Sequence, residues 1–279
     1  MTSASGTLGV ALISGAARGI GSAVAIAFAE AGYDVAMFDV CRPVGGAAHD
    51  MSGREDLDAT MAGITSRGRR CHGDAVDVRD LPAVENFIAD AESALGPITA
   101  VCANAGLSTP ARPFWEIDAE QWQLTLDVNL TGVWHLARAV APRLVARGRG
   151  SIVVMASTNG RDATPGGAGY CASKHGVLGL SKTIAAELAP HGVRCNAVLP
   201  GRIETPLVGR ATGGGPRPDD RRYTALRDVG LLPTRSVADA VMWLAGDGAA
   251  HITGTELVVD AGGQLLRGLN PRYVDDRPQ

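Results

Sequence analysis

Lysine is almost absent from this sequence of 279 residues, which has two lysines, Lys174 and Lys182, against 24 arginines. Basic residues as a whole are in slight deficit, since the formal net charge is −3. Nucleic-acid-binding domains usually carry a basic excess, so the composition argues against a nucleic-acid partner. The scarcity of lysine makes each remaining lysine informative, because arginine cannot replace a compact ammonium group everywhere.

Long apolar runs and paired cysteines are missing as well. No apolar stretch approaches the roughly 18 residues of a membrane span, and residues 1–9 lack the basic start of a signal peptide. The five cysteines are scattered and odd in number, as is typical of reduced thiols. The six histidines show no metal-binding spacing such as HExxH. We therefore expect a cytoplasmic protein with no membrane anchor and no catalytic metal.

The sequence does contain a regular alternation of β-rich runs and helical segments. Strands are predicted at residues 10–14, 34–38, 70–75, 98–102, 151–155, 193–199 and 256–260, and helices at 22–30, 54–67, 81–94, 119–147, 169–188 and 237–245. Pro142 predicts a kink in the longest helix. Because no linker or repeat interrupts the pattern, residues 1–279 are predicted to form a single α/β domain. We expect a Rossmann-type, doubly wound sheet of seven parallel strands with helices on both faces.

A glycine-rich turn follows the first predicted strand. Gly15, Gly19 and Gly21 lie between that strand and a helix, where residues without a side chain let the backbone approach a pyrophosphate. The strand before the turn and the helix after it favour a dinucleotide site over a tight structural turn.

The end of the second strand bears on which dinucleotide is bound. Asp39, 18 residues past Gly21, could accept hydrogen bonds from ribose hydroxyls and would repel a 2′-phosphate, which favours NAD. Arg18 favours NADP instead, because a guanidinium beside the turn could bind that phosphate. We weigh Asp39 more heavily, although a strand-end cap on the surface is the simpler interpretation of this residue.

A tyrosine and one of the two lysines share a helix face. Tyr170 and Lys174 are four residues apart, and an ammonium beside a phenol stabilises phenolate, which predicts a general acid/base. Ser157, 13 residues before Tyr170, follows a predicted buried strand and could polarise a substrate oxygen. The alternative is a surface tyrosine, a strand-end serine and a solvated lysine.

These motifs together resemble the short-chain dehydrogenase/reductase family, in its branch of about 250 residues. The resemblance covers about residues 8–263. It implies that Asn129, Ser157, Tyr170 and Lys174 are catalytic. It also implies cofactor contacts from Gly15, Arg18, Gly19, Ile20, Gly21, Asp39, Asp77, Val78, Asn104, Ala105, Gly106, Tyr170, Lys174, Pro200, Gly201, Ile203 and Thr205. The sequence departs from the family pattern at Ser14, where threonine is usual, and at Ala103, where asparagine is common.

The segment after Asp39 is longer than is usual in the family. It is similar to carveol-dehydrogenase-like members, some of which are associated with the electron carrier mycofactocin, and this resemblance implies a flap formed by residues 42–50 over the adenosine half of the cofactor. The resemblance further implies a homodimer or homotetramer that pairs the long helices holding Asn129 and Tyr170.

The sequence as a whole therefore predicts an NAD-dependent enzyme that interconverts a secondary alcohol and a ketone, with a hydrophobic small-molecule substrate. Residues 158–169 and a lid at 208–232 are expected to select that substrate, with Trp115 as a further wall, and residues 265–279 read as a polar tail. The alternatives are an NADP-dependent ketoreductase, a non-redox enzyme and an NAD-binding regulator on the same fold.

Overall fold

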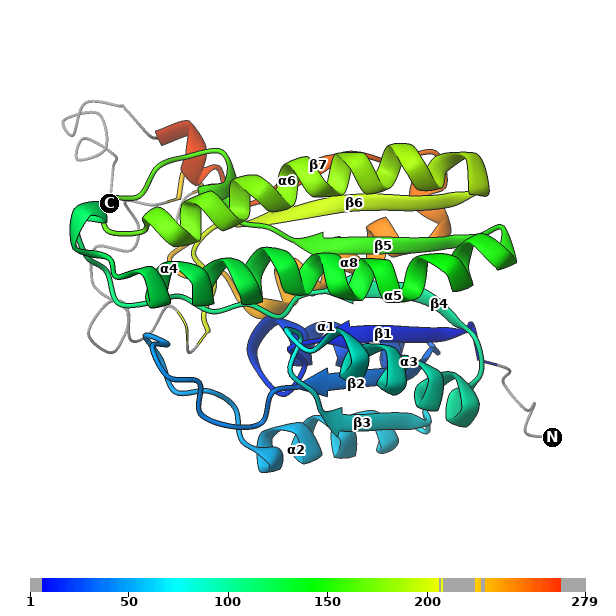
Figure 1. Cartoon of the computed structure of the whole chain (residues 1–279). Coiled ribbons are helices and arrows are strands. Elements are labelled where there is room, and N and C mark those ends of the chain that lie inside the picture. The colour runs from blue at the N-terminus through cyan, green and yellow to red at the C-terminus, as the bar shows by residue number, and fades with distance from the viewer. Residues whose placement is uncertain (1–6, 206, 208–223, 227–228, 267–279) are drawn as a thin grey trace.

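The structure is a computed structural model that describes residues 7–205, 207, 224–226 and 229–266. Its centre is a sheet of seven parallel strands in the order β3-β2-β1-β4-β5-β6-β7 (Figure 1). The strands are β1 (Val10–Ser14), β2 (Asp34–Asp39), β3 (Cys71–Ala75), β4 (Ile98–Ala103), β5 (Gly150–Met155), β6 (Val193–Pro200) and β7 (Glu256–Val259). The predicted fold class, a seven-stranded parallel sheet of Rossmann type, is confirmed.

Helices cover both faces of the sheet because the strands are apolar on both sides. In β1, Val10 and Leu12 belong to one buried apolar cluster, whereas Ala11 and Ile13 belong to the other. The first cluster packs under α3 (Leu81–Leu95), α5 (Gly132–Arg147) and α6 (Ala168–Leu188). The second packs under α1 (Gly19–Glu30), α2 (Arg54–Thr65) and α8 (Thr234–Ala245). Figure 1 shows α3, α5 and α6 in front of the sheet.

The long helix predicted for residues 119–147 is interrupted. The structure has α4 (Ala119–Leu126), a π-helical turn η2 (Asp127–Thr131) and then α5. Helix α5 continues through Pro142, so the break lies at Asn129 rather than at the proline. The side chain of Asn129 is hydrogen-bonded to the neighbouring loop at Leu107, and π turns of this kind occur often at functional sites.

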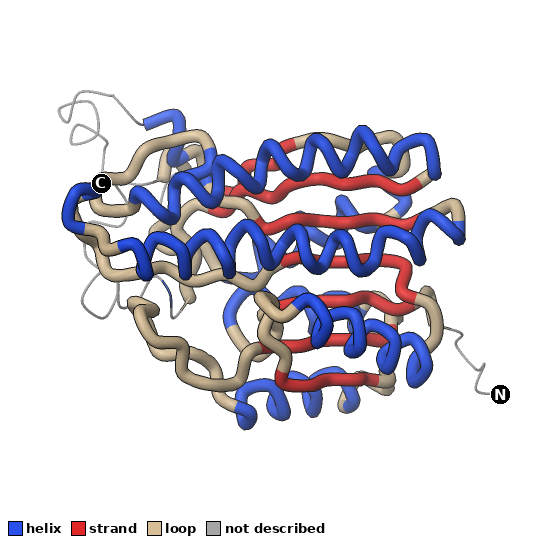
Figure 2. The backbone as a smooth tube through the Cα atoms, in the orientation of Figure 1, coloured by secondary structure: helices blue, strands red, loops and turns tan. Residues whose placement is uncertain are grey.

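The carboxyl ends of the parallel strands meet at one edge of the sheet, where the loops gather (Figure 2). Strand order reverses between β1 and β4, and in open α/β sheets ligands bind in the crevice at that point. The short helical turns of the described residues are η1 (Phe114–Glu116), η3 (Thr158–Gly160), η4 (Ala189–His191), η6 (Asp247–Ala249) and η7 (Gly263–Leu266). Within the described ranges, no helix is long and apolar enough to cross a membrane.

Candidate active site

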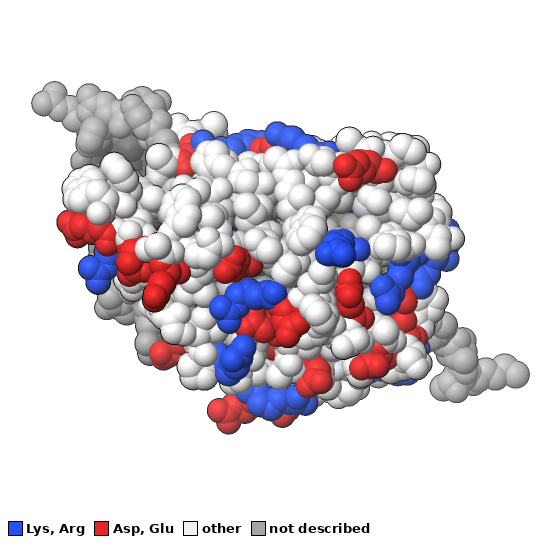
Figure 3. All heavy atoms as spheres, in the orientation of Figure 1, with Lys and Arg blue, Asp and Glu red and all other residues white. Residues whose placement is uncertain are grey.

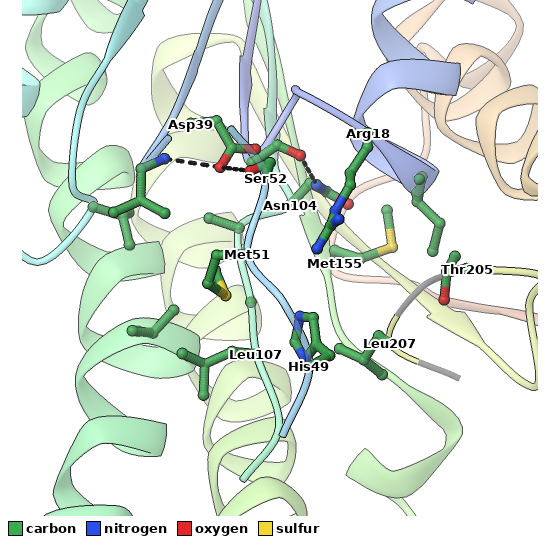
Figure 4. A pocket seen from close by; sticks show the side chains of 18 of the residues that line it. Arg18, Asp39, His49, Met51, Ser52, Asn104, Leu107, Met155, Thr205 and Leu207 are labelled. Atoms are coloured by element: carbon green, nitrogen blue, oxygen red, sulfur yellow. Dashed lines mark hydrogen bonds between the residues drawn. The ribbon is translucent and has the colours of Figure 1, made fainter. Parts of the chain in front are cut away.

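A pocket opens at the carboxyl edge of the sheet, where the loops after β1, β2, β4, β5 and β6 meet (Figure 4). Most of the side chains singled out from the sequence line it. These are Gly15, Arg18, Gly19, Ile20, Asp39, Asp77, Val78, Asn104, Ala105, Gly106, Ser157, Tyr170, Lys174, Pro200, Gly201, Ile203 and Thr205. Of the predicted catalytic and cofactor-contact residues, two do not line it: Gly21, which packs behind the turn, and Asn129, which is fully buried.

The glycine turn has a backbone that only glycine adopts easily. Gly15 and Gly19 have φ angles of +66° and +61°, in the left-handed region. A Cβ at Gly21 would lie 2.0 Å from the carbonyl oxygen of Gly15. Helix α1 then begins with no side-chain cap and no acidic residue in its first turn, so its N-terminal N–H groups remain available to a phosphate.

Asn104 and Ser14 fix the turn against the end of β4. The Asn104 amide donates to the carbonyls of Ser14 and Gly15, at 3.1 and 2.9 Å. The Ser14 hydroxyl accepts from the N–H groups of Asn104 and Ala105, both at 3.1 Å. The serine that replaces the family's threonine therefore retains its hydroxyl function.

Asp39 lies at the end of β2 and is 8% exposed. One carboxylate oxygen, Oδ2, accepts from the N–H of Ala17 at 3.0 Å. The other, Oδ1, accepts from the N–H of Val40 at 2.8 Å and from the hydroxyl of Ser52 at 2.6 Å. A carboxylate beside a glycine turn and a free helix N-terminus fits the adenosine side of a dinucleotide, since ribose hydroxyls are donors and the pyrophosphate is anionic.

The segment between β2 and α2 closes one side of this pocket. It contributes Val44, His49, Met51 and Ser52 to the lining, and Figure 4 shows His49 and Met51 facing the pocket from this segment. None of these four was singled out from the sequence, because a glycine- and proline-containing loop has no periodicity to indicate which residues turn inward. The only signal was the unusual length of the segment.

Several contacts hold this segment across the pocket. A guanidinium nitrogen of Arg18 donates to the backbone carbonyl of Asp50. Arg42 forms an ion pair with Asp77 at 2.9 Å. Ser52 donates to Asp39, and the N–H of Ala48 donates to the carbonyl of Ser108 at 2.8 Å. Residues 42–50, for which a flap over the adenosine half of the cofactor is predicted, thus lie along one side of the pocket.

Asp77, the implied adenine contact, is held by two arginines. Burial acts to raise the pKa of its carboxyl, but hydrogen bonds from Arg79 and the charges of Arg79 and Arg42 bring that pKa below its usual range. The side chain of Arg79 donates to both carboxylate oxygens, at 2.9 and 2.6 Å. Asp77 is therefore a charged anchor for the segment between β2 and α2 as well as a wall of the pocket.

Ser157, Tyr170 and Lys174 meet at the opposite end of the pocket. Ser157 follows β5 and begins η3, where its hydroxyl accepts from the N–H of Asn159 at 3.1 Å. Its side chain is also hydrogen-bonded to the phenol of Tyr170. The amine of Lys174 donates to the carbonyl of Met155 at 2.8 Å and lies 5.6 Å from the centre of the Tyr170 ring.

The electrostatics of this group differ from the expectation. Burial raises the pKa of the Tyr170 phenol, and the hydrogen bond with Ser157 only partly offsets this effect. The sequence predicted that Lys174 lowers the pKa of the Tyr170 phenol, and this prediction was wrong for the protein without its cofactor. Burial also lowers the pKa of Lys174 to about 8, because the charged amine is poorly solvated there. In the protein without its cofactor, the phenol of Tyr170 therefore keeps its proton to a higher pH than a free phenol does, whereas Lys174 loses its proton near pH 8.

Known proteins are similar to this chain along almost its whole length. A family model described as Enoyl-(Acyl carrier protein) reductase matches residues 15–264. The (-)-trans-carveol dehydrogenase of Rhodococcus erythropolis is 36% identical over 269 residues, which cover 92% of this chain and 97% of that protein. The chain belongs to the short-chain dehydrogenase/reductase family.

Solved structures of the same family are also similar. The crystal structure of carveol dehydrogenase from Mycobacterium avium in complex with NAD has a TM-score of 0.88 and 38% identity, and covers 93% of this chain and 98% of that one. A short chain dehydrogenase from Mycobacterium paratuberculosis bound to NAD has a TM-score of 0.84 and 34% identity, over 92% and 97% of the two chains.

Several of the residues expected to select a substrate lie away from the pocket. In the loop after Ser157, Arg161 turns away to an ion pair with Glu256 at 2.6 Å, and Asp162 accepts from Gln264 at 2.5 Å. Trp115 is 72% exposed and does not line the pocket. Most of the expected lid at 208–232 and of the tail at 265–279, namely 208–223, 227–228 and 267–279, lies outside the described residues.

Proposed function

We propose that the chain is an NAD-dependent oxidoreductase that interconverts a secondary alcohol and a ketone. The observation that carries the proposal is that Ser157, Tyr170 and Lys174 share one pocket with the glycine turn and Asp39. A candidate general acid/base thus shares one pocket with groups suited to binding a dinucleotide. Relatives described as a carveol dehydrogenase and as NAD-dependent oxidoreductases support this assignment.

The cofactor is NAD rather than NADP. A 2′-phosphate on the adenosine ribose would meet the negative charge of Asp39, which no cation contacts in the described part of the chain. Arg18, the residue that could compensate for that charge, donates instead to the carbonyl of Asp50. The NAD-bound structures of related enzymes support the same choice.

Two ends of the pocket would hold the two halves of the cofactor. The helix α1 N-terminus and Asp39 would hold the pyrophosphate and adenosine ribose, and Asp77 and Val78 would border the adenine. Ile203 and Thr205, beyond β6, would bind the carboxamide of the nicotinamide. When bound, the nicotinamide ring supplies the acceptor or donor for hydride transfer.

The side chains of the chain itself then handle the substrate oxygen and its proton. The Ser157 hydroxyl would hold the substrate oxygen against Tyr170, with which it is already hydrogen-bonded. Tyr170 would take the hydroxyl proton during oxidation and return it during reduction. Lys174 would stabilise the phenolate and bind ribose hydroxyls on the nicotinamide side. Asn129 lies behind Lys174 and would complete the path by which the proton reaches solvent.

The substrate is a small hydrophobic alcohol. Leu107, Val128, Met155 and Leu207 line the pocket and offer an apolar surface. Such a surface binds a substrate mainly through burial of its carbon skeleton, while one or two polar groups fix its orientation.

The enzyme assembles as a homodimer or homotetramer through α4, α5 and α6. Trp122 and Trp134 on this layer are 39% and 43% exposed, although large aromatic side chains are usually buried in an interface or a core. Figure 3 shows that charged side chains are sparse over the upper part of this face. The five cysteines carry free thiols, as expected for a cytoplasmic enzyme.

The test has two stages. The purified protein is first examined for co-purified nucleotide, and a panel of hydrophobic secondary alcohols is then offered with added NAD or NADP while reduced nucleotide and ketone are both quantified. We expect ketone formation with NAD and little with NADP. Bound NAD that no alcohol in the panel reduces, even with an artificial electron acceptor present, would contradict the proposal.

A further inference from the structure

The carboxylate of Asp39 has little capacity left for a ligand. An ionised carboxylate offers about four acceptor positions. The N–H of Val40 and the hydroxyl of Ser52 occupy two of them at Oδ1, and the N–H of Ala17 occupies one at Oδ2. One position therefore remains on Oδ2, whereas the adenosine ribose presents two hydroxyl donors. A second acceptor beside Asp39 would allow both hydroxyls to be bound.

Ser52 has the chemistry and the position of that acceptor. Its hydroxyl donates its single proton to Asp39 at 2.6 Å, so its oxygen lone pairs remain available. No other hydrogen bond of this hydroxyl occurs within the described residues. The side chain is 4% exposed and lines the pocket, and Figure 4 shows it next to Asp39.

The position of Ser52 in the chain supports a ligand role. It belongs to the segment between β2 and α2, which Arg42 and Arg18 already hold by two contacts away from Asp39. The next residue, Gly53, caps α2 with its own backbone N–H donating to Asp56 at 2.8 Å. The segment is therefore anchored on both sides of Ser52 by contacts that do not involve the Ser52 hydroxyl.

We propose that Ser52 is a ribose-binding residue: its oxygen accepts one adenosine ribose hydroxyl while Oδ2 of Asp39 accepts the other. This inference rests on the proposed placement of the adenosine ribose at Asp39. It assigns a direct cofactor contact to the segment after β2, which then recognises the ribose as well as covering it.

The test pairs a protein change with a ligand change. Dissociation constants of NAD and of its 2′-deoxy and 3′-deoxy adenosine analogues are measured by calorimetry on nucleotide-free, full-length protein and on Ser52→Ala. In the unchanged protein each analogue is expected to bind more weakly than NAD, by about 3- to 10-fold or more. In Ser52→Ala one of the two analogues should bind as tightly as NAD does. The hydroxyl that this analogue lacks has no acceptor in the variant, so NAD gains nothing from it. Ser52→Thr, which keeps the hydroxyl, should restore the discrimination.

Two controls separate the possible failures. Arg42→Ala loosens the same segment without touching Asp39, so it should weaken NAD and both analogues by the same factor. If Ser52→Ala behaves as Arg42→Ala does, Ser52 only fastens the segment and the inference is wrong. If Asp39→Asn leaves the affinities for NAD and both analogues unchanged, the placement of the ribose at Asp39 fails as well.

Discussion

The side-chain amide of Asn129 pairs with both backbone groups of Leu107, accepting from its N–H at 2.8 Å and donating to its carbonyl at 2.9 Å. The same amide donates to the hydroxyl of Ser173 at 3.3 Å, and Ser173 donates to the carbonyl of Tyr170 at 2.7 Å. Asn129 thus connects the loop after β4 with the helix that carries the tyrosine. The π turn at residues 127–131 places the amide at this junction.

Removal of this amide should destabilise the fold. Asn129→Ala leaves the buried N–H and carbonyl of Leu107 without partners, and we expect the free energy of unfolding to fall by roughly 2–4 kcal/mol. Chemical denaturation measures the change. Asn159→Ala is the matched control, since it removes an amide whose one hydrogen bond, to Thr164, is exposed. Equal effects of the two substitutions would show that the Leu107 contact does not stabilise the protein.

Tyr170 should be required for turnover but not for cofactor binding. Tyr170→Phe keeps the ring and removes the proton acceptor, so we expect kcat for alcohol oxidation to fall by at least about 100-fold. The dissociation constant of NAD should stay within a factor of about three. Tyr33→Phe is the control, because Tyr33 is in edge-to-face contact with Phe28 and does not line the pocket. Substantial remaining activity in Tyr170→Phe would exclude it as the base.

Alcohol oxidation should depend on pH near 8. Below this pH Lys174 holds its proton; as pH rises through about 8 it loses that proton, and the neutral amine beside the Tyr170 ring can then accept the proton of the phenol. The kcat/KM for oxidation should therefore rise about tenfold per pH unit and level off above about 8. Ketone reduction, which needs the protonated pair, should fall over the same range. A profile for oxidation that is flat between pH 6 and 9 would contradict this coupling.

The segment at residues 42–50 should slow the release of NAD. Its contacts through Arg42 and through the Asp50 carbonyl span the side of the pocket that we propose for the adenosine. Replacement of these residues by a short glycine linker should raise the NAD dissociation rate by at least about tenfold, as measured by stopped-flow displacement. Arg235→Ala, which breaks an ion pair with Glu30 outside the pocket, should leave the rate unchanged. Unaltered exchange in the linker variant would rule out a covering role.

Sequence patterns predicted the strands of the sheet closely. They predicted most residues of the candidate site but not the electrostatics of that site. Strand β1 was placed to the residue, since a buried parallel strand is a continuous apolar run between turn residues. The single helix predicted for residues 119–147 was wrong, because a π turn at residues 127–131, where Asn129 contacts Leu107, divides it into α4 and α5. The direction of the Tyr170 pKa was also wrong, because burial depends on the whole fold and outweighs a charge four residues away in sequence.

The reversal of strand order between β1 and β4 divides the proposed site along the chain. Groups for the adenosine side come from residues 15–79, and groups for the reacting side come from residues 104–205. The two sets lie in separate stretches of the gene and in separate halves of the sheet. Mutation or recombination can therefore alter nucleotide preference and substrate chemistry one at a time, so that a lineage can keep its cofactor while it acquires a new reaction.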